Sequence, residues 1–234
     1  MLVPSPRVLR ALERLNAAYP WDHNAHYHPW ILSRLPGTFA TALDIGSGTG
    51  DLARLLAERA TSRVDGIDSD PAIVARAQSL TPPGSPLTRT AADASAPPPV
   101  VTFTTADALT GIPDDRRYDV ITCVATIHHL PFAEALRVFR EHLAPGGTLV
   151  VLGLSRPTTR EDFRCDLASA ALNPIMGMLK NRGRRADRPA SMTARTRHAE
   201  MSYPGIARET AAILPGAELR RCLFWRYSLV WHMP

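Results

Sequence analysis

The stretch from Ala42 to Asp51 constrains the fold of this chain more than any other, with the sequence ALDIGSGTGD. An apolar run ends at Asp44, three alternating glycines follow, and apolar residues continue from Leu52 with helical spacing. This order predicts a buried strand, a tight glycine turn and the first turn of a helix. Because the first N–H groups of a helix lack partners within it, the turn favours an anion or the polar end of a ligand.

The glycine spacing distinguishes between two kinds of ligand. A dinucleotide-binding turn follows G-x-G-x-x-G, and counting from Gly46 its third glycine would fall at Asp51. The chain instead has Asp44 followed by Gly46, Gly48 and Gly50. This departure counts against a nicotinamide-dependent oxidoreductase, an alternative that titration with NADH would test by fluorescence.

Composition allows one substantial core. The chain has 234 residues, of which 45% are hydrophobic and 21% charged, as in an ordinary globular domain. No apolar run approaches the roughly 20 residues of a membrane span, and the first residues lack the features of a signal peptide. The three cysteines lie far apart and in no C-x-x-C arrangement, which predicts free thiols, a cytoplasmic location and no zinc site.

The net charge is +5, and Lys180 is the only lysine, so arginine supplies nearly all the basic charge. One arginine-rich cluster stands out at residues 182–188, RGRRADR. A solvated loop is the simplest interpretation of this cluster. Recognition of an acidic or phosphorylated substrate is the alternative, and RNA is one such substrate.

The first 36 residues are interpreted as an N-terminal helical cap. Residues 6–18 have the apolar spacing of an amphipathic helix. The segment 19–30 follows, rich in aromatic residues and histidines but without helix or strand periodicity, and a short helix is expected at 31–35. Its histidines match no known ligand spacing, so we expect no metal. The segment either caps a cofactor pocket or packs on the core.

Strands and helices alternate through the middle of the chain. Strands are expected at residues 41–45, 63–67, 100–104, 118–124 and 148–154, and helices at 51–60, from 71 onward and at 132–143. Asp70 is the expected cap of the second of these helices, with Pro71 in its first turn. Residues 81–99, rich in Pro, Ala, Thr and Ser, are predicted to be a flexible excursion. The alternation predicts a doubly wound α/β sheet, mostly parallel.

Several polar residues fall at the ends of these strands. Asp44, Asp68 and Asp107 fall at the ends of three expected strands, and residues 124–126 fall at the end of the fourth. Ligands of such sheets bind outside the carboxyl ends of the strands. Asp68 lies 18 residues after Gly50, about where a Rossmann-like fold contacts ribose hydroxyls. For Asp107, a purely turn-forming role is the alternative.

The pattern changes after the fifth strand. Residues 160–180 predict a helix with an apolar face, interrupted by Asn173-Pro174; the face includes Phe163, Leu167, Ala171, Leu172 and Met178. A helix at 203–214 follows. The stretches 217–224 and 227–231 then predict a β-hairpin.

Taken together, these motifs resemble the class I S-adenosylmethionine-dependent methyltransferases, in their small-molecule branch (methyltransferase type 11/25-like). The resemblance rests on Asp-x-Gly-x-Gly-x-Gly at 44–50, on the strand 118–124 with the residues after it, and on Leu-x-Pro-Gly-Gly-x-Leu at 143–149. It covers residues 38–154 strongly and 203–233 more loosely. The Asn-Pro-Pro-Tyr-type sequence of enzymes that methylate nucleobase amines is absent, which counts against a base-modifying role.

The resemblance implies a Rossmann-like, doubly wound seven-stranded sheet of order 3-2-1-4-5-7-6 with the last strand antiparallel. The domain would span residues 37–234, with a helical, arginine-rich insertion at about 155–202. The implied cofactor is S-adenosylmethionine, with the Gly46–Gly50 turn on its methionine portion, Asp68 on the ribose and Asp107 on the adenine. Further cofactor contacts are expected from Asp44, Ser47, Ser69, Ala108, Val124, Ala125 and Tyr27.

The sulfonium of this cofactor is already a good methyl donor, so the protein must chiefly hold a nucleophile in line with the methyl group. His129 is favoured as a general base over its neighbour His128, and His28 is next if the N-terminal segment closes over the donor. A hydrophobic small molecule is the expected acceptor, methylated on oxygen or, second, on carbon, with secondary metabolism as the suggested setting. The alternatives are a methyltransferase-fold protein without transfer activity, such as a cyclase or a cofactor-binding regulator, and an RNA methyltransferase. We expect a monomer or a homodimer.

Overall fold

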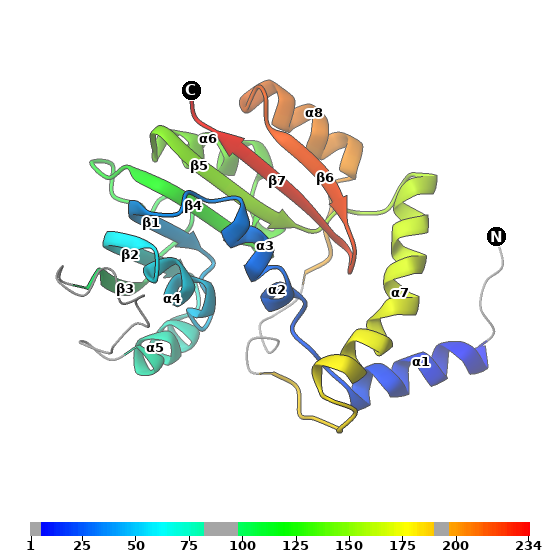
Figure 1. Ribbon diagram of the computed structural model, residues 1–234. Coiled ribbons are helices and arrows are strands. Elements are labelled where there is room, and N and C mark those ends of the chain that lie inside the picture. Colours follow the sequence, from blue (N-terminus) through cyan, green and yellow to red (C-terminus); the bar gives the residue numbers. More distant parts are fainter. Residues whose placement is uncertain (1–5, 82–97, 190–196) are drawn as a thin grey trace.

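The computed structural model describes residues 6–81, 98–189 and 197–234 (Figure 1). The predicted excursion at 81–99 therefore lies almost entirely outside the described residues. Seven strands form one sheet of order β3-β2-β1-β4-β5-β7-β6, which confirms the expected order. The strands are β1 (Phe39–Ile45), β2 (Ala60–Asp68), β3 (Val100–Thr105), β4 (Tyr118–Val124), β5 (Leu143–Gly153), β6 (Glu218–Cys222) and β7 (Arg226–His232).

Strand direction also agrees with the expectation. The pairs β3–β2, β2–β1, β1–β4 and β4–β5 are parallel, whereas β7 runs antiparallel to both β5 and β6. The carboxyl ends of β1 to β5 consequently meet at one edge of the sheet. The antiparallel return places the start of β7 at that same edge, since Tyr227, its second residue, pairs with Gly153.

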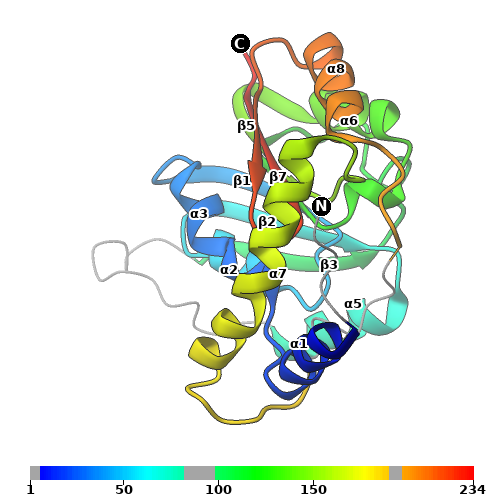
Figure 2. The same ribbon diagram turned by 90° about the vertical axis from the view of Figure 1, so that its right-hand side faces the viewer.

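Helices cover both faces of the sheet (Figures 1 and 2). The helices are α1 (Pro6–Ala18), α2 (His23–His26), α3 (His28–Ser33), α4 (Asp51–Ala57), α5 (Pro71–Leu80), α6 (Phe132–Glu141), α7 (Arg160–Lys180) and α8 (Tyr203–Ile213), with a short 3₁₀ helix η2 (Ile127–His129). One core cluster joins the sheet to α3, α4 and α5, and the other joins it to α6 and α8. Adjacent residues of one strand serve opposite clusters, as Val120 and Ile121 do, because side chains alternate along a strand.

The N-terminal segment is more helical than its sequence pattern predicts. Residues 23–26 form α2, and α3 begins at His28 rather than at residue 31. The cause is local capping: the Asp22 carboxylate accepts hydrogen bonds from the backbone N–H groups of Asn24 and Ala25. Pro29 in the first turn of α3 supports the earlier start.

The fifth strand also begins earlier than expected. The helix expected at 132–143 and the strand expected at 148–154 leave Pro145-Gly146-Gly147 between them, but β5 starts at Leu143 and includes these residues. Leu143 pairs with Tyr118, and the pairing register then shifts before Val120 pairs with Thr148. The proline and glycines therefore mark an irregularity within the strand.

The helix predicted at 160–180 forms in full, with Pro174 inside it. Its buried residues are polar, proline or glycine: Asp162, Ser169, Asn173, Pro174 and Gly177. Its large apolar side chains, Leu167 among them, are exposed instead. Figure 2 shows α7 running across the front of the molecule. No helix in the described parts of the chain is both long and apolar enough to cross a bilayer.

Candidate functional site

Asp44 lies one residue before the end of β1 and is buried at the carboxyl edge of the sheet. Its side chain is 2% exposed, and the hydroxyl of Thr122 on neighbouring β4 donates a hydrogen bond of 2.7 Å to it. Burial raises the pKa of Asp44 to about 7, against the opposing effect of that hydrogen bond. Its carboxyl group is therefore held near the midpoint of its titration at neutral pH.

The glycine turn follows directly, with backbone conformations that only glycine adopts easily. Gly46, Gly48 and Gly50 have φ angles of +69°, +52° and +80°. A Cβ atom on Gly46 would overlap the side chain of Thr126, and one on Gly50 would overlap the ring of Phe103. A Cβ on Gly48 would meet nothing within 4 Å. The backbone of the turn at Gly48 therefore faces open space.

Hydrogen bonds tie this turn to the end of β2. The N–H groups of Gly46 and Ser47 both donate to the Ile67 carbonyl, at 2.8 and 3.0 Å. The Asp68 carboxylate accepts from the N–H groups of Gly48 and Asp70, each at 3.0 Å. Asp44, the turn and Asp68 are thus brought into one group, as the sequence predicts. Ser69, the next expected cofactor contact, is exposed beside them.

Ser47 carries an unusual feature for a turn residue. The residue is 8% exposed, and its hydroxyl oxygen is buried without a hydrogen-bond partner among the described residues. Buried hydroxyl groups nearly always have partners. A polar ligand group beside the turn would supply the missing one.

Asp107 lies after β3, where it shapes the local turn. One carboxylate oxygen accepts from the N–H groups of Leu109 and Thr110, at 2.8 and 3.2 Å. The turn-forming role considered for Asp107 is therefore present in the structure, and the adenine contact remains a prediction. The neighbouring Ala108, another expected contact, is 9% exposed and belongs to the core.

The chain turns sharply after β4. Ala125 has a φ of +52°, a conformation that residues other than glycine rarely adopt, and its N–H donates to the Leu152 carbonyl at 2.7 Å. Such strain persists only where the surrounding structure holds it. Here it directs the chain from Val124 into η2, with the Thr126 side chain against Gly46.

The two histidines of η2 lie beside one another, with ring centroids 4.1 Å apart. The Nδ1 atom of His128 is buried without a hydrogen-bond partner in the described residues. Burial, aided by nearby His129, Arg226 and Arg197, lowers the pKa of His128 to about 4. Burial also lowers the pKa of the more exposed His129. Both rings are therefore neutral at neutral pH, the state in which imidazole can accept a proton.

A cavity of about 210 Å³ opens beside His128. Its walls come from η2, the start of α6, the segment before α8, α8 itself and β7, and include His128, Leu130, Phe132, Met201, Ile206 and Tyr227. The lining is mostly apolar. Sequence reasoning missed Met201 and Tyr227 because no local pattern connects them with the end of β4.

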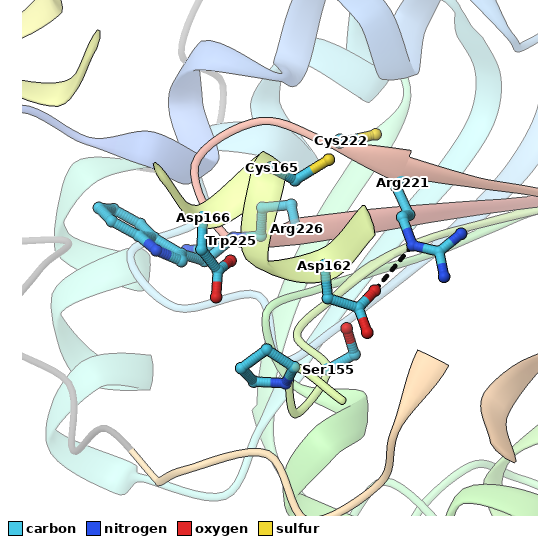
Figure 3. A pocket seen from close by; sticks show the side chains of 9 residues that line it. Ser155, Asp162, Cys165, Asp166, Arg221, Cys222, Trp225 and Arg226 are labelled. Carbon is cyan, nitrogen blue, oxygen red and sulfur yellow. Dashed lines mark hydrogen bonds and ion pairs between the residues drawn. The ribbon is translucent and has the colours of Figure 1, made fainter. Parts of the chain in front are cut away.

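A second, smaller hollow of about 20 Å³ lies between α7 and the β6–β7 hairpin (Figure 3). Figure 3 shows Arg221 reaching toward Asp162 of α7, and the Arg221 Nε to Asp162 Oδ1 distance is 2.7 Å. Burial alone would raise the pKa of Asp162, but hydrogen bonds from the Thr158 and Thr159 backbone and from Arg221 together outweigh it and lower the pKa to about 2. The contact between α7 and the β6–β7 hairpin therefore contains a charged pair, Arg221 and Asp162.

Hydrogen bonds also join the N-terminal segment to α7 and to the β6–β7 hairpin. Trp21 Nε1 donates to Asn173 Oδ1 at 2.9 Å, and Arg226 Nη2 donates to Asn24 Oδ1 at 2.9 Å. The Tyr27 hydroxyl, expected to contact the cofactor, donates to the Leu223 carbonyl at 2.8 Å.

His28, the third histidine proposed as a base, has a pKa lowered by burial. Its neighbours Tyr27 and Trp30 pack against the core cluster that contains the buried residues of α4, whereas Ile127 of η2 belongs to the other cluster. His28 is thus on the side of the glycine turn, whereas His128 and His129 follow β4.

Comparison with known proteins points to one family. Residues 42–147 match the family described as methyltransferase domain. An uncharacterized methyltransferase of Mycobacterium tuberculosis (strain ATCC 25618 / H37Rv) is 28% identical over 92% of this chain and 98% of its own. Trans-aconitate 2-methyltransferase of Streptomyces avermitilis is 35% identical, over 55% of this chain and 45% of its own.

Solved structures share the fold. A SAM-dependent methyltransferase from Aquifex aeolicus superposes with a TM-score of 0.54 at 12% identity, covering 99% of this chain and 100% of its own. Magnesium protoporphyrin IX methyltransferase from Synechocystis PCC 6803, solved with bound SAH, has a TM-score of 0.51 at 16% identity, covering 98% and 95%. At these identities the likeness concerns the fold alone.

Proposed function

Since the chain belongs to the class I small-molecule methyltransferases, we propose that it transfers the methyl group of S-adenosylmethionine to an oxygen atom of a small, largely hydrophobic acceptor. One observation carries the proposal: the glycine turn, with Asp44 and Asp68, shares its sheet edge with an apolar cavity that His128 lines. This is the edge where ligands of doubly wound sheets bind. Carbon is the second choice of acceptor atom.

The residues at the turn fit the proposed cofactor. The open space at Gly48 admits a ligand against bare backbone, and the unpartnered Ser47 hydroxyl calls for a polar group. We assign the Gly46–Gly50 turn to the methionine portion, Asp68 to the ribose hydroxyls and Asp107 to the adenine amine. The bound cofactor supplies an activated methyl group on a sulfonium.

The residues after β4 would position the acceptor. The cavity beside His128 suits an apolar group of modest size, since most of its lining is apolar. We propose His129 as the general base for a hydroxyl acceptor, since its ring is neutral at neutral pH and lies against His128. His128 would help to position that ring. His28 remains the alternative on the opposite side.

We further propose that residues 1–36 act as a cap and that about 155–202 is an insertion into the domain at 37–234. Support comes from the hydrogen bonds that join the N-terminal segment to α7 and to the β6–β7 hairpin. The proposal includes a cytoplasmic location, a single-copy or homodimeric state, and no role for nucleic acid.

The first test is calorimetric titration with S-adenosylmethionine and S-adenosylhomocysteine. Micromolar binding of both is the expected result, and binding of neither would refute the cofactor assignment. Conversion of S-adenosylmethionine to S-adenosylhomocysteine over many turnovers, with a panel of hydrophobic hydroxyl compounds, would then test transfer. Tight cofactor binding without turnover on any acceptor class would favour a cofactor-binding protein that has lost transfer.

A further inference from the structure

The outward face of α7 is apolar, which reverses the usual arrangement of a surface helix. The exposed fractions of Leu167, Ile175 and Leu179 are 68%, 53% and 67%. The side of α7 that packs against the protein carries Asp162, Ser169 and other small or polar residues instead. At 100° per residue, the exposed apolar residues occupy one half of the helix surface: Phe163, Leu167, Ala171, Leu172, Ile175, Met178 and Leu179.

Arg164, near the start of the helix, lies on this face, and from Leu167 to Leu179 no polar residue does. Between Arg164 and Lys180 the only charged residue is Asp166, which lies toward the hollow beside Arg226 and Trp225. Figures 1 and 2 both show α7 at the periphery of the molecule, next to α1. A contiguous exposed apolar surface of this kind marks an interaction site.

Basic side chains border the apolar face at both ends. Arg160 and Arg164 are exposed at the start of α7. At its end the exposed basic residues are Lys180, Arg182, Arg184, Arg185 and Arg188. The nearby acids are fewer, and one of them, Glu161, is paired with Arg221 at 3.0 Å. The arginine cluster seen in the sequence thus adjoins the apolar face.

The basic end of α7 is held in place by backbone and side-chain contacts. The Gly183 N–H donates to the Met178 carbonyl at 2.8 Å, and the Ala186 N–H donates to the Ala18 carbonyl of α1 at 3.3 Å. The Asn181 side-chain amide donates to the Pro20 carbonyl at 2.9 Å. The apolar face and the arginines therefore form one preassembled surface.

We propose that this surface, defined by the outward side of α7 and residues 180–188, docks the protein onto a bilayer that contains anionic phospholipids. Apolar side chains would enter the boundary between head groups and acyl chains, while the flanking arginines bind lipid phosphates. A second copy of the chain fits less well. Two such helices packed antiparallel would bring the basic start of one near the basic end of the other.

The test is cosedimentation of the full chain with vesicles of phosphatidylcholine alone and with 30% phosphatidylglycerol. Binding to the anionic vesicles is expected, with weaker binding to the neutral ones and weakening in high salt. The double variant Arg184→Gln/Arg185→Gln should bind anionic vesicles about 30-fold more weakly, at roughly fivefold per arginine. The double variant Ile175→Ser/Leu179→Ser should bind anionic vesicles at least about tenfold more weakly.

A matched control is available on the opposite side of the molecule. Leu80 is 42% exposed and Arg76 is exposed, both on α5, so Arg76→Gln/Leu80→Ser removes the same kinds of group elsewhere. This control should bind vesicles like the unmodified protein. Circular dichroism would confirm that all variants fold.

Two results would overturn the proposal. One is the absence of binding to anionic vesicles, or binding that neither pair of α7-side substitutions weakens. The other is a dimer, measured by light scattering, that persists in the presence of anionic vesicles and becomes a monomer in the variant Ile175→Ser/Leu179→Ser. The inference is independent of the proposed methyl transfer, which none of these measurements examines.

Discussion

Replacing Gly48 with alanine separates the role of the glycine turn in folding from its role in ligand binding. Gly48 has a φ of +52°, and a Cβ there would meet no atom within 4 Å. An alanine at this position therefore carries only the backbone strain of the left-handed region, about 1 kcal/mol. For a chain of this size, that strain lowers Tm by roughly 2–4 °C.

The same Cβ points into the space assigned to the methionine portion of the cofactor. We expect Gly48→Ala to weaken binding of S-adenosylhomocysteine at least about tenfold, or about 1.4 kcal/mol. Gly216→Ala is the matched control, because Gly216 has a φ of +83° and open space around its Cβ, but lies in the turn before β6. It should lower Tm by a similar amount and leave binding unchanged.

Gly46→Ala completes the series. Its Cβ would overlap the Thr126 side chain, so overpacking of about 1–3 kcal/mol adds to the backbone strain and Tm should fall further than in Gly48→Ala. Thermal unfolding and calorimetry on the three variants give the comparison. If Gly48→Ala binds S-adenosylhomocysteine with unchanged affinity, the assignment of the turn to the cofactor is wrong.

Three further predictions concern the acids and histidines of the site. Asp68→Ala should weaken S-adenosylmethionine binding about tenfold or more by calorimetry, because ribose hydroxyls lose a charged acceptor; unchanged affinity would remove Asp68 from that role. His129→Ala should slow turnover with little change in cofactor affinity, and undiminished turnover would exclude His129 as the base. The pKa of Asp44 is raised from 3.8 to about 7, so the folded protein favours the protonated carboxyl group. The stability that this preference contributes is fully present below about pH 4 and is lost as the pH rises to about 7. Asp44→Asn keeps an acceptor for Thr122 and should therefore raise Tm more at pH 8 than at pH 5, measured without ligand; equal shifts at both pH values would contradict a buried charge at Asp44.

Much of the sheet was predictable because its signals are local. The apolar runs, the alternating glycines and the Asp70 cap each act within a few residues, and all five central strands and the terminal hairpin form at or near their predicted positions. The errors have local causes as well. The Asp22 carboxylate caps α2 where no apolar periodicity signals a helix, and β5 runs through Pro145-Gly146-Gly147, residues that usually interrupt a strand.

The sequence by itself determined where the strands lie along the chain, the glycine turn and the acids at the strand ends, because periodicity and turn chemistry depend on neighbouring residues. The order of the strands in the sheet came from the resemblance to a known family. The tertiary structure alone decided which distant residues meet at the sheet edge. Tyr227 reaches the cavity beside His128 only because β7 returns antiparallel along β5. It also decided the direction of the apolar face of α7, since a helical pattern shows which residues share a face but not whether that face packs on the core or meets solvent.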